Sequence, residues 1–283
     1  MRYRTRLLLF VCIFAVAPLH SQVTLKRDSL YSQSLGRAKQ VVVLLPSGYT
    51  DSREYPVLYL LHGLTGNCTD WTSRTKLKLY AEAFSFIIVM PDGEDSWYVN
   101  SRGVPENRFE DYMMKDIPEY VRQHYSIDTA RQAIAGLSMG GYGSLMLALR
   151  HPGRFRFAGG LSSAITVPRV MDERGRTAPL NESTVSLVTA FGSEPGTFRK
   201  EHDVMWLYRD LPAASIPYIY LSIGTQDGYR DFLPAHRELT DSLRGRGILY
   251  EYHELPGEHN WHFWDQEIRP LLQRLQDILM TKP

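Results

Sequence analysis

The chain has 283 residues, of which 43% are hydrophobic and 22% charged, and its formal net charge at pH 7 is +1. This balance argues against a nucleic-acid-binding protein, because such proteins usually carry a concentrated basic patch. Its two cysteines, Cys12 and Cys68, cannot supply a thiolate zinc site or a disulfide framework.

Residues 1–21 have the layout of a secretory signal peptide. The basic head MRYRTR precedes the apolar run LLLFVCIFAVAPL, and small and polar residues follow at a predicted cut near Ser21–Gln22. A membrane anchor or a core helix is the alternative, but the run is short for a bilayer and no other segment approaches the needed length. Removal of the three arginines takes the formal net charge from +1 to −2 and leaves Cys68 as the single cysteine. We therefore expect an exported protein, periplasmic or secreted, with no membrane span in the mature chain.

The mature chain, residues 22–283, is predicted to be a single domain, because no linker, low-complexity tract or repeat divides it. Apolar runs predict buried strands at 41–46, 56–63, 84–93, 131–138, 155–163, 216–224 and 248–257. Helical patterns lie between them near 71–83, 109–125, 140–151, 233–246 and 262–279. Most of the strand patterns are continuous rather than alternating, which is typical of a parallel sheet covered on both faces. The prediction is a doubly wound α/β fold with a mostly parallel central sheet.

The segment 164–215 differs from the rest, with few long apolar runs and mixed turn signals such as FGSEPGTF. We interpret it as an excursion that covers one edge of the sheet. In open α/β sheets the ligand crevice lies beyond the carboxyl ends of the strands. The residues that directly follow each apolar run are therefore the candidates for function.

Ser138 lies in AIAGLSMGGYGSLMLAL, after a predicted strand and at the start of a predicted helix. One interpretation is a helix cap, because a serine hydroxyl accepts hydrogen bonds from unpaired backbone N–H groups. The other is a nucleophile elbow, a sharp strand-to-helix turn that needs small neighbours, here Gly136 and Gly140. A serine nucleophile requires a base and a carboxylate that orients the base, so the rest of the chain must supply both.

In this type of fold the acid and then the histidine follow the nucleophile along the chain. Asp227 directly follows the run IPYIYLSIG and is the candidate acid, with a turn or cap role as the alternative and Asp231 as the reserve. His259 lies in the loop PGEHN after the last predicted strand and is the candidate base. His253 falls within a strand pattern and His262 starts a helical run, so both are weaker candidates. A metal held by His259 and His262 lacks a third ligand, and we expect no metal and no cofactor.

Attack on an ester also requires donors for the developing oxyanion. The backbone N–H of Met139, directly after the nucleophile, is one candidate. HGLTG at 62–66 resembles the loops that supply the second donor, which we assign to the N–H of Leu64. We expect His62 to support this loop by a hydrogen bond rather than to act as an acid or base.

The motifs LLHGLTGNCTDW, VMPDGEDSWYVNS, AGLSMGGYGSLMLAL, GTQDG and PGEHNWHFW together resemble the esterase D-type branch of α/β hydrolases. That branch includes tributyrin esterases, feruloyl and acetyl-xylan esterases of carbohydrate esterase family one, and S-formylglutathione hydrolases. The resemblance spans about residues 24–279 and implies an α/β-hydrolase fold. It implies the same five residues: Ser138, Asp227 and His259 as triad, and Leu64 and Met139 as oxyanion donors.

The resemblance implies a serine carboxylesterase for short acyl or aryl esters, such as acetyl or feruloyl groups on plant-derived oligosaccharides, and the predicted signal peptide implies that this enzyme is exported. Trp97, Tyr98 and Trp261 are candidate substrate contacts because aromatic faces stack on sugar or aryl rings, with core packing as the alternative. Competing hypotheses are an acyltransferase to a sugar hydroxyl, an S-formylglutathione-hydrolase-like thioesterase and a noncatalytic ligand-binding relative. The expected partner is a small-molecule or oligosaccharide ester, and the sequence does not indicate an oligomeric state.

Overall fold

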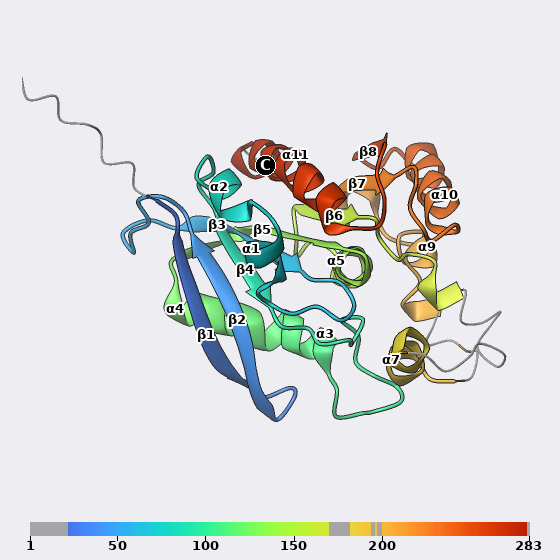
Figure 1. Ribbon diagram of the computed structural model, residues 1–283, viewed down its shortest axis with the longest axis horizontal. Coiled ribbons are helices and arrows are strands. Elements are labelled where there is room, and N and C mark those ends of the chain that lie inside the picture. Colours follow the sequence, from blue (N-terminus) through green and yellow to red (C-terminus); the bar gives the residue numbers. More distant parts are fainter. Residues whose placement is uncertain (1–21, 170–181, 194–195, 197–199, 282–283) are drawn as a thin grey trace, which may run out of the picture.

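The computed structural model describes residues 22–169, 182–193, 196 and 200–281 (Figure 1). The predicted signal peptide, residues 1–21, lies outside this part of the chain. The strands are β1 Thr24–Ser32, β2 Arg37–Leu45, β3 Tyr55–Leu61, β4 Ile87–Pro91, β5 Ile127–Leu137, β6 Phe157–Leu161, β7 Tyr218–Gly224 and β8 Tyr250–Leu255. The α-helices are α1 Asp70–Arg74, α2 Leu77–Ala81, α3 Phe109–Asp111, α4 Ile117–His124, α5 Met139–Arg150, α7 Glu182–Phe191, α9 Val204–Leu207, α10 Phe232–Gly245 and α11 Trp261–Met280. A π-helical turn, η1 Tyr112–Asp116, and a 3₁₀ turn, η2 Ala213–Ser215, complete the list.

The strands form one sheet in the order β1-β2-β4-β3-β5-β6-β7-β8. Strands β1, β2 and β4 pair antiparallel, and every pairing from β4 through β3 to β8 is parallel. All residues of β3, β4 and β6 are buried, which explains their continuous apolar sequences. The structure therefore confirms the predicted mostly parallel α/β sheet.

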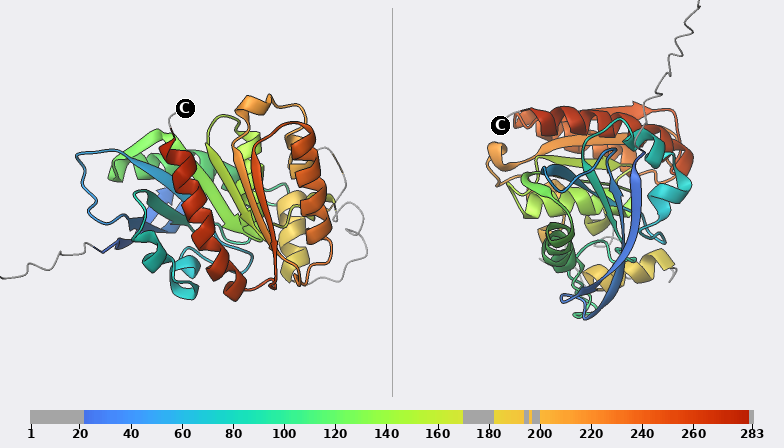
Figure 2. Two further views of the ribbon diagram at one scale, coloured as in Figure 1. Left: turned by 90° about the horizontal axis from the view of Figure 1, so that it is seen from above. Right: turned by 90° about the vertical axis from the view of Figure 1, so that its left-hand side faces the viewer.

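Helices cover both faces of the sheet and bury two apolar cores (Figure 2). One core joins the sheet to α1, α2 and the long α11, with Trp71 and Leu271 among its buried side chains. The other joins it to α4, α5 and α10, with Val121, Leu145 and Leu239 buried. This double cover leaves the ends of the strands, rather than a face of the sheet, for a ligand site.

Two of the predicted helices are interrupted. The segment 71–83 contains α1 and α2, separated at Thr75, whose backbone is extended. The segment 109–125 contains α3, the π-helical turn and α4. Among the described residues, no helix combines the length and the apolar character that crossing a membrane requires.

The predicted excursion 164–215 lies partly outside the described residues, at 170–181, 194–195 and 197–199. Its described parts include α7 and α9, which pack beside α5 and the loop after β4. Tyr142 donates to the carbonyl of His202 at 2.9 Å, and Gly103 N–H donates to the carbonyl of Thr189 at 2.9 Å. None of its described residues lines the pocket around Ser138.

Candidate active site

Ser138 lies at the turn between β5 and α5, with φ +50° and ψ −115°. A positive φ is unfavourable for a serine, so the surrounding structure must hold it. Its N–H donates to the carbonyl of Leu161 at 2.9 Å, and its carbonyl accepts from the N–H groups of Tyr142 at 2.9 Å and Ala164 at 3.1 Å. The hydroxyl makes no capping hydrogen bond to α5. The backbone therefore fixes the turn, and the side chain is available for other contacts.

The glycines beside Ser138 permit close backbone contact. A Cβ atom on Gly140 would lie 2.4 Å from the carbonyl oxygen of His62, and one on Gly136 would lie 2.5 Å from the backbone of Gly140. Side chains essentially never approach backbone atoms so closely. Glycine is required at both positions because β5, α5 and the end of β3 meet there.

The structure brings together the three side chains that the sequence singled out. The Nε2 atom of His259 lies 2.9 Å from the hydroxyl oxygen of Ser138, and its Nδ1 atom lies 2.8 Å from Oδ2 of Asp227. An ionised carboxylate only accepts hydrogen bonds, so Nδ1 carries the proton and Nε2 presents its lone pair to the serine hydroxyl. This is the arrangement that general-base activation of a serine requires.

Asp227 and His259 are largely shielded from water, with 1% and 14% of their side chains exposed. The second carboxylate oxygen of Asp227 accepts the N–H of Tyr229 at 2.9 Å. The rings of Tyr229, Phe232 and Trp264 surround the imidazole, with centroid distances of 4.7, 5.8 and 5.0 Å. These contacts fix the orientation of both side chains.

The alternative residues have other partners. Asp231 accepts the hydroxyl of Thr166 at 2.7 Å, and His253 contacts Glu251 at 2.7 Å. His262 contacts Gln266, one turn further along α11, at 3.1 Å. Neither this aspartate nor these two histidines contacts Ser138. Within the described ranges, no group of three or more metal-binding side chains gathers.

A pocket of about 580 Å³ opens at Ser138. Its walls come from the loop after β3, from α1, from the loop after β7 and from the start of α11. The lining residues are Gly63, Leu64, Thr65, Gly66, Asp70, Arg74, Leu137, Ser138, Tyr229, His259, Asn260, Trp261 and Trp264. The predicted residues Leu64 and Trp261 are thus at the pocket, and Met139 is the first residue of α5. Tyr229 and Arg74 also line the pocket and were not predicted, although Tyr229 directly follows the motif GTQDG and Arg74 lies three residues after LLHGLTGNCTDW.

Trp97 and Tyr98 do not face this pocket, and their predicted contact with substrate is wrong. Their exposed fractions are 4% and 0%. The Trp97 indole donates to the Ser186 hydroxyl at 3.0 Å, and the Tyr98 hydroxyl donates to the carbonyl of His62 at 3.0 Å. Both residues have positive φ, 56° and 58°, and this backbone conformation accompanies side chains that are packed in the core. The core-packing alternative therefore holds for this pair.

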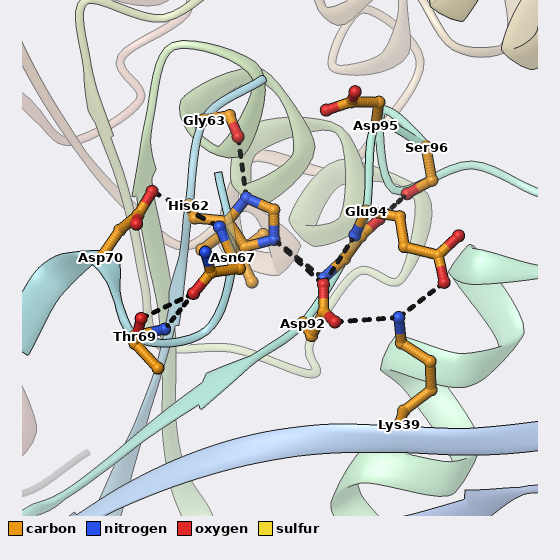
Figure 3. A network of polar contacts seen from close by, with 12 residues as sticks. Lys39, His62, Gly63, Asn67, Thr69, Asp70, Asp92, Glu94, Asp95 and Ser96 are labelled. Atoms are coloured by element: carbon orange, nitrogen blue, oxygen red, sulfur yellow. Dashed lines mark hydrogen bonds and ion pairs between the residues drawn. The ribbon is translucent and has the colours of Figure 1, made fainter. Parts of the chain in front are cut away.

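A polar network connects the loop after β3 to the loop after β4 (Figure 3). His62 is 1% exposed, and burial lowers its pKa. Its Nε2 atom accepts the N–H of Gly93 at 2.9 Å, so Nδ1 carries the proton and donates to the carbonyl of Gly63 at 2.7 Å. Beneath it, buried Lys39 pairs with Asp92 at 3.1 Å and with Glu94 at 2.6 Å. His62 therefore supports the loop, as the sequence predicts.

Cys68 is buried, and burial raises the pKa of its thiol to about 11. A thiol with so high a pKa carries almost no thiolate at neutral pH, and the thiolate is the reactive form. The side chain packs in the core formed with α1, α2 and α11.

Comparison with known proteins places these features in context. Residues 32–275 match the model of the Esterase family, described as "Putative esterase". An acetyl esterase from Caldicellulosiruptor saccharolyticus is 29% identical over 256 residues, which cover 85% of this chain and 93% of that protein.

Two solved structures from Staphylococcus aureus are similar over most of the chain. The fluorophosphonate-binding serine hydrolase FphF has a TM-score of 0.76 and 26% identity, and the match covers 90% of this chain and 98% of that one. The S-formylglutathione hydrolase FrmB has a TM-score of 0.76 and 25% identity, and the match covers 90% and 99%.

Proposed function

The chain belongs to the Esterase family and is a carboxylic ester hydrolase, and from that premise we propose that it is an exported serine esterase with Ser138, His259 and Asp227 as its catalytic triad. The observation that carries the proposal is the continuous hydrogen-bonded chain from the Ser138 hydroxyl through the His259 imidazole to the Asp227 carboxylate. The layout of residues 1–21 supports export.

In the first half of the reaction, His259 Nε2 takes the hydroxyl proton as Ser138 Oγ attacks the ester carbonyl. The tetrahedral oxyanion accepts hydrogen bonds from the backbone N–H groups of Leu64 and Met139. Collapse of this intermediate breaks the ester bond, and the proton held on His259 passes to the departing alcohol. Ser138 is then acylated. Asp227 stabilises the imidazolium throughout and does not itself take the proton.

In the second half, water replaces the alcohol. His259 takes a proton from the water as its oxygen attacks the acyl carbonyl, and the same two N–H groups bind the second oxyanion. Collapse breaks the acyl–Oγ bond, and the proton returns to Ser138. The carboxylic acid leaves, and the enzyme has its original protonation state.

The proposed substrates are short acyl or aryl esters, with acetyl and feruloyl esters of plant-derived oligosaccharides as the leading class. A pocket of about 580 Å³ is within the range of small-molecule sites. Trp261 and the half-exposed Tyr229 in its wall offer aromatic surface for a sugar or aryl group. The relative named as an acetyl esterase supports an acetyl donor.

A thioesterase is the second candidate, because FrmB is named as an S-formylglutathione hydrolase. The triad geometry serves oxygen and sulfur leaving groups alike, so kinetics must separate them. We would compare kcat/KM for acetyl, butyryl and feruloyl esters, for acetylated and feruloylated xylo-oligosaccharides, and for S-formylglutathione. The primary proposal predicts that an oxygen ester is the best substrate, and a higher kcat/KM for the thioester would favour the second candidate.

The triad assignment has its own test with p-nitrophenyl acetate. Ser138→Ala removes the nucleophile but preserves the Cβ atom and the backbone of the turn. Its kcat should fall by roughly 10⁴-fold or more with an unchanged melting temperature. A variant with wild-type turnover would rule out Ser138 as the nucleophile.

A further inference from the structure

Leu64, the proposed oxyanion donor, lies in a loop with an unfavourable backbone conformation. Thr65, the next residue, has φ +61° although it is β-branched. A β-branched residue with positive φ is a genuine outlier, and such conformations persist only where neighbouring contacts enforce them. The position of the Leu64 N–H therefore depends on what holds the loop.

Two side chains hold the peptide groups on either side of Leu64. The peptide that carries the Leu64 N–H has the Gly63 carbonyl at its other end, and that carbonyl accepts the Nδ1–H of His62 at 2.7 Å. The next peptide carries the Thr65 N–H, which donates to Oδ1 of Asp95 at 2.6 Å. The N–H and C=O of a trans peptide point in opposite directions. Because His62 is buried beneath the loop, its bond to the Gly63 carbonyl directs the Leu64 N–H away from the core.

Asp95 lies in the loop that follows β4, and hydrogen bonds of its neighbours hold that loop (Figure 3). The Ser96 hydroxyl donates to the carbonyl of Gly93 at 2.6 Å, and the Gly93 N–H donates to Nε2 of His62 at 2.9 Å. Asp95 and His62 thus belong to one hydrogen-bonded unit, although they are separated by 33 positions in the chain. A carboxylate that accepts a backbone N–H at this distance makes a charge-assisted hydrogen bond, which is stronger than a neutral one.

We propose that Asp95 is a positioning residue for ester hydrolysis, and that together with His62 it holds the Leu64 N–H where the oxyanion forms. Asp95 does not line the pocket, so it acts through the loop rather than by contact with substrate. The inference rests on the proposed function, because it assumes Leu64 as an oxyanion donor.

The role predicts a specific kinetic signature. An oxyanion donor acts mainly in the transition state, so loss of its position lowers kcat more than it changes KM. Removal of a complete donor costs about 10²–10³-fold in kcat, and a loosened donor should cost less than that. We expect Asp95→Ala to lower kcat for p-nitrophenyl acetate about ten-fold or more, with KM within about two-fold of the wild type.

The experiment compares Asp95→Ala and Asp95→Ser, which both remove the carboxylate acceptor, with Asp95→Asn, whose side-chain oxygen still accepts the Thr65 N–H. The control is Asp128→Ala. Asp128 also accepts a backbone N–H, that of Ala130 at 2.9 Å, but at the opposite end of β5 from Ser138. The readouts are kcat, KM, the melting temperature and the inhibition constant of a trifluoromethyl ketone, which forms a tetrahedral adduct in the active site.

The proposal predicts that Asp95→Ala and Asp95→Ser weaken binding of the trifluoromethyl ketone by the same factor by which they lower kcat. Asp95→Asn should keep most of the wild-type inhibitor affinity and most of the wild-type kcat. Asp128→Ala should change neither the inhibitor affinity nor kcat. If one of the two truncated variants does not fold, the other carries the comparison. Wild-type kcat in a folded truncated variant, a loss confined to KM, or no rescue by asparagine would overturn the inference. Ser138→Ala measured in parallel separates the two claims, since an active Ser138→Ala would instead refute the proposed function.

Discussion

The change of Asp227 to asparagine should nearly abolish activity because of the contacts that surround this side chain. One carboxylate oxygen accepts the Tyr229 N–H at 2.9 Å, and the other accepts from His259 Nδ1 at 2.8 Å. An asparagine has a single side-chain oxygen, which cannot serve both donors. If that oxygen accepts the Tyr229 N–H, the NH₂ group donates to Nδ1 of His259. The proton of the imidazole then moves to Nε2, which can no longer take the proton of Ser138.

The opposite orientation of the amide would place its NH₂ group against the Tyr229 N–H and leave that donor unsatisfied. Loss of this solvent-accessible hydrogen bond costs about 0.5–1.5 kcal/mol, which favours the inactive orientation by about 2- to 13-fold. The variant also loses the negative charge that stabilises the imidazolium in the transition state. Together these effects should approach the roughly 10⁴-fold loss of kcat known for this substitution in a serine triad.

The assay is kcat/KM for p-nitrophenyl acetate between pH 6 and 9, with the melting temperature as a measure of folding. Asp231→Asn is the matched control, because Asp231 lies four residues away and contacts Thr166 rather than His259. We expect this control to retain activity within about two-fold. A folded Asp227→Asn variant within ten-fold of the wild type, or an inactive Asp231→Asn, would show that the triad reasoning is mistaken.

Two further predictions concern packing and pH. Gly140→Ala places a Cβ atom 2.4 Å from the carbonyl oxygen of His62, so unfolding should require about 1–3 kcal/mol less free energy and turnover should fall. Gly245→Ala, at the end of α10 with open space around it, is the control, and equal melting temperatures for the two variants would contradict the steric argument. Burial lowers the pKa of His236 from 6.5 to about 4. As the pH falls, this histidine therefore takes up a proton in the unfolded state before it does so in the folded state. This group should therefore remove about 3 kcal/mol of stability between pH 6.5 and 4. Denaturant titrations of wild type and His236→Gln at both pH values measure this loss of stability. An identical pH dependence of the unfolding free energy in the two proteins would refute the assignment to His236.

The fold could be predicted from the sequence where strands are buried on both faces. The runs that became β3, β4 and β6 are continuous and apolar, and each of these strands is fully buried. Strand β1, with the sequence TLKRDSLYS, was not predicted. It lies at the edge of the sheet with most of its side chains exposed, so it shows no apolar run.

The positions of the candidate site residues followed from one rule, that the loops after parallel strands meet at one edge of the sheet. Ser138, Asp227 and His259 each follow a strand, and the structure places them in contact. The rule does not say which way a loop side chain points. Trp97 and Tyr98 also follow a strand, but their left-handed backbone accompanies side chains buried in the core, and no residue pattern indicates a positive φ at positions that are not glycine.

The nucleophile itself can be identified directly by covalent labelling. A fluorophosphonate should react once per chain, and peptide mass spectrometry should locate the adduct on Ser138. His259→Ala should slow this labelling sharply, because the hydroxyl then lacks its base, and Ser138→Ala should not be labelled. An adduct on another residue, or an unchanged labelling rate without the imidazole, would contradict the central claim that Ser138 and His259 act together.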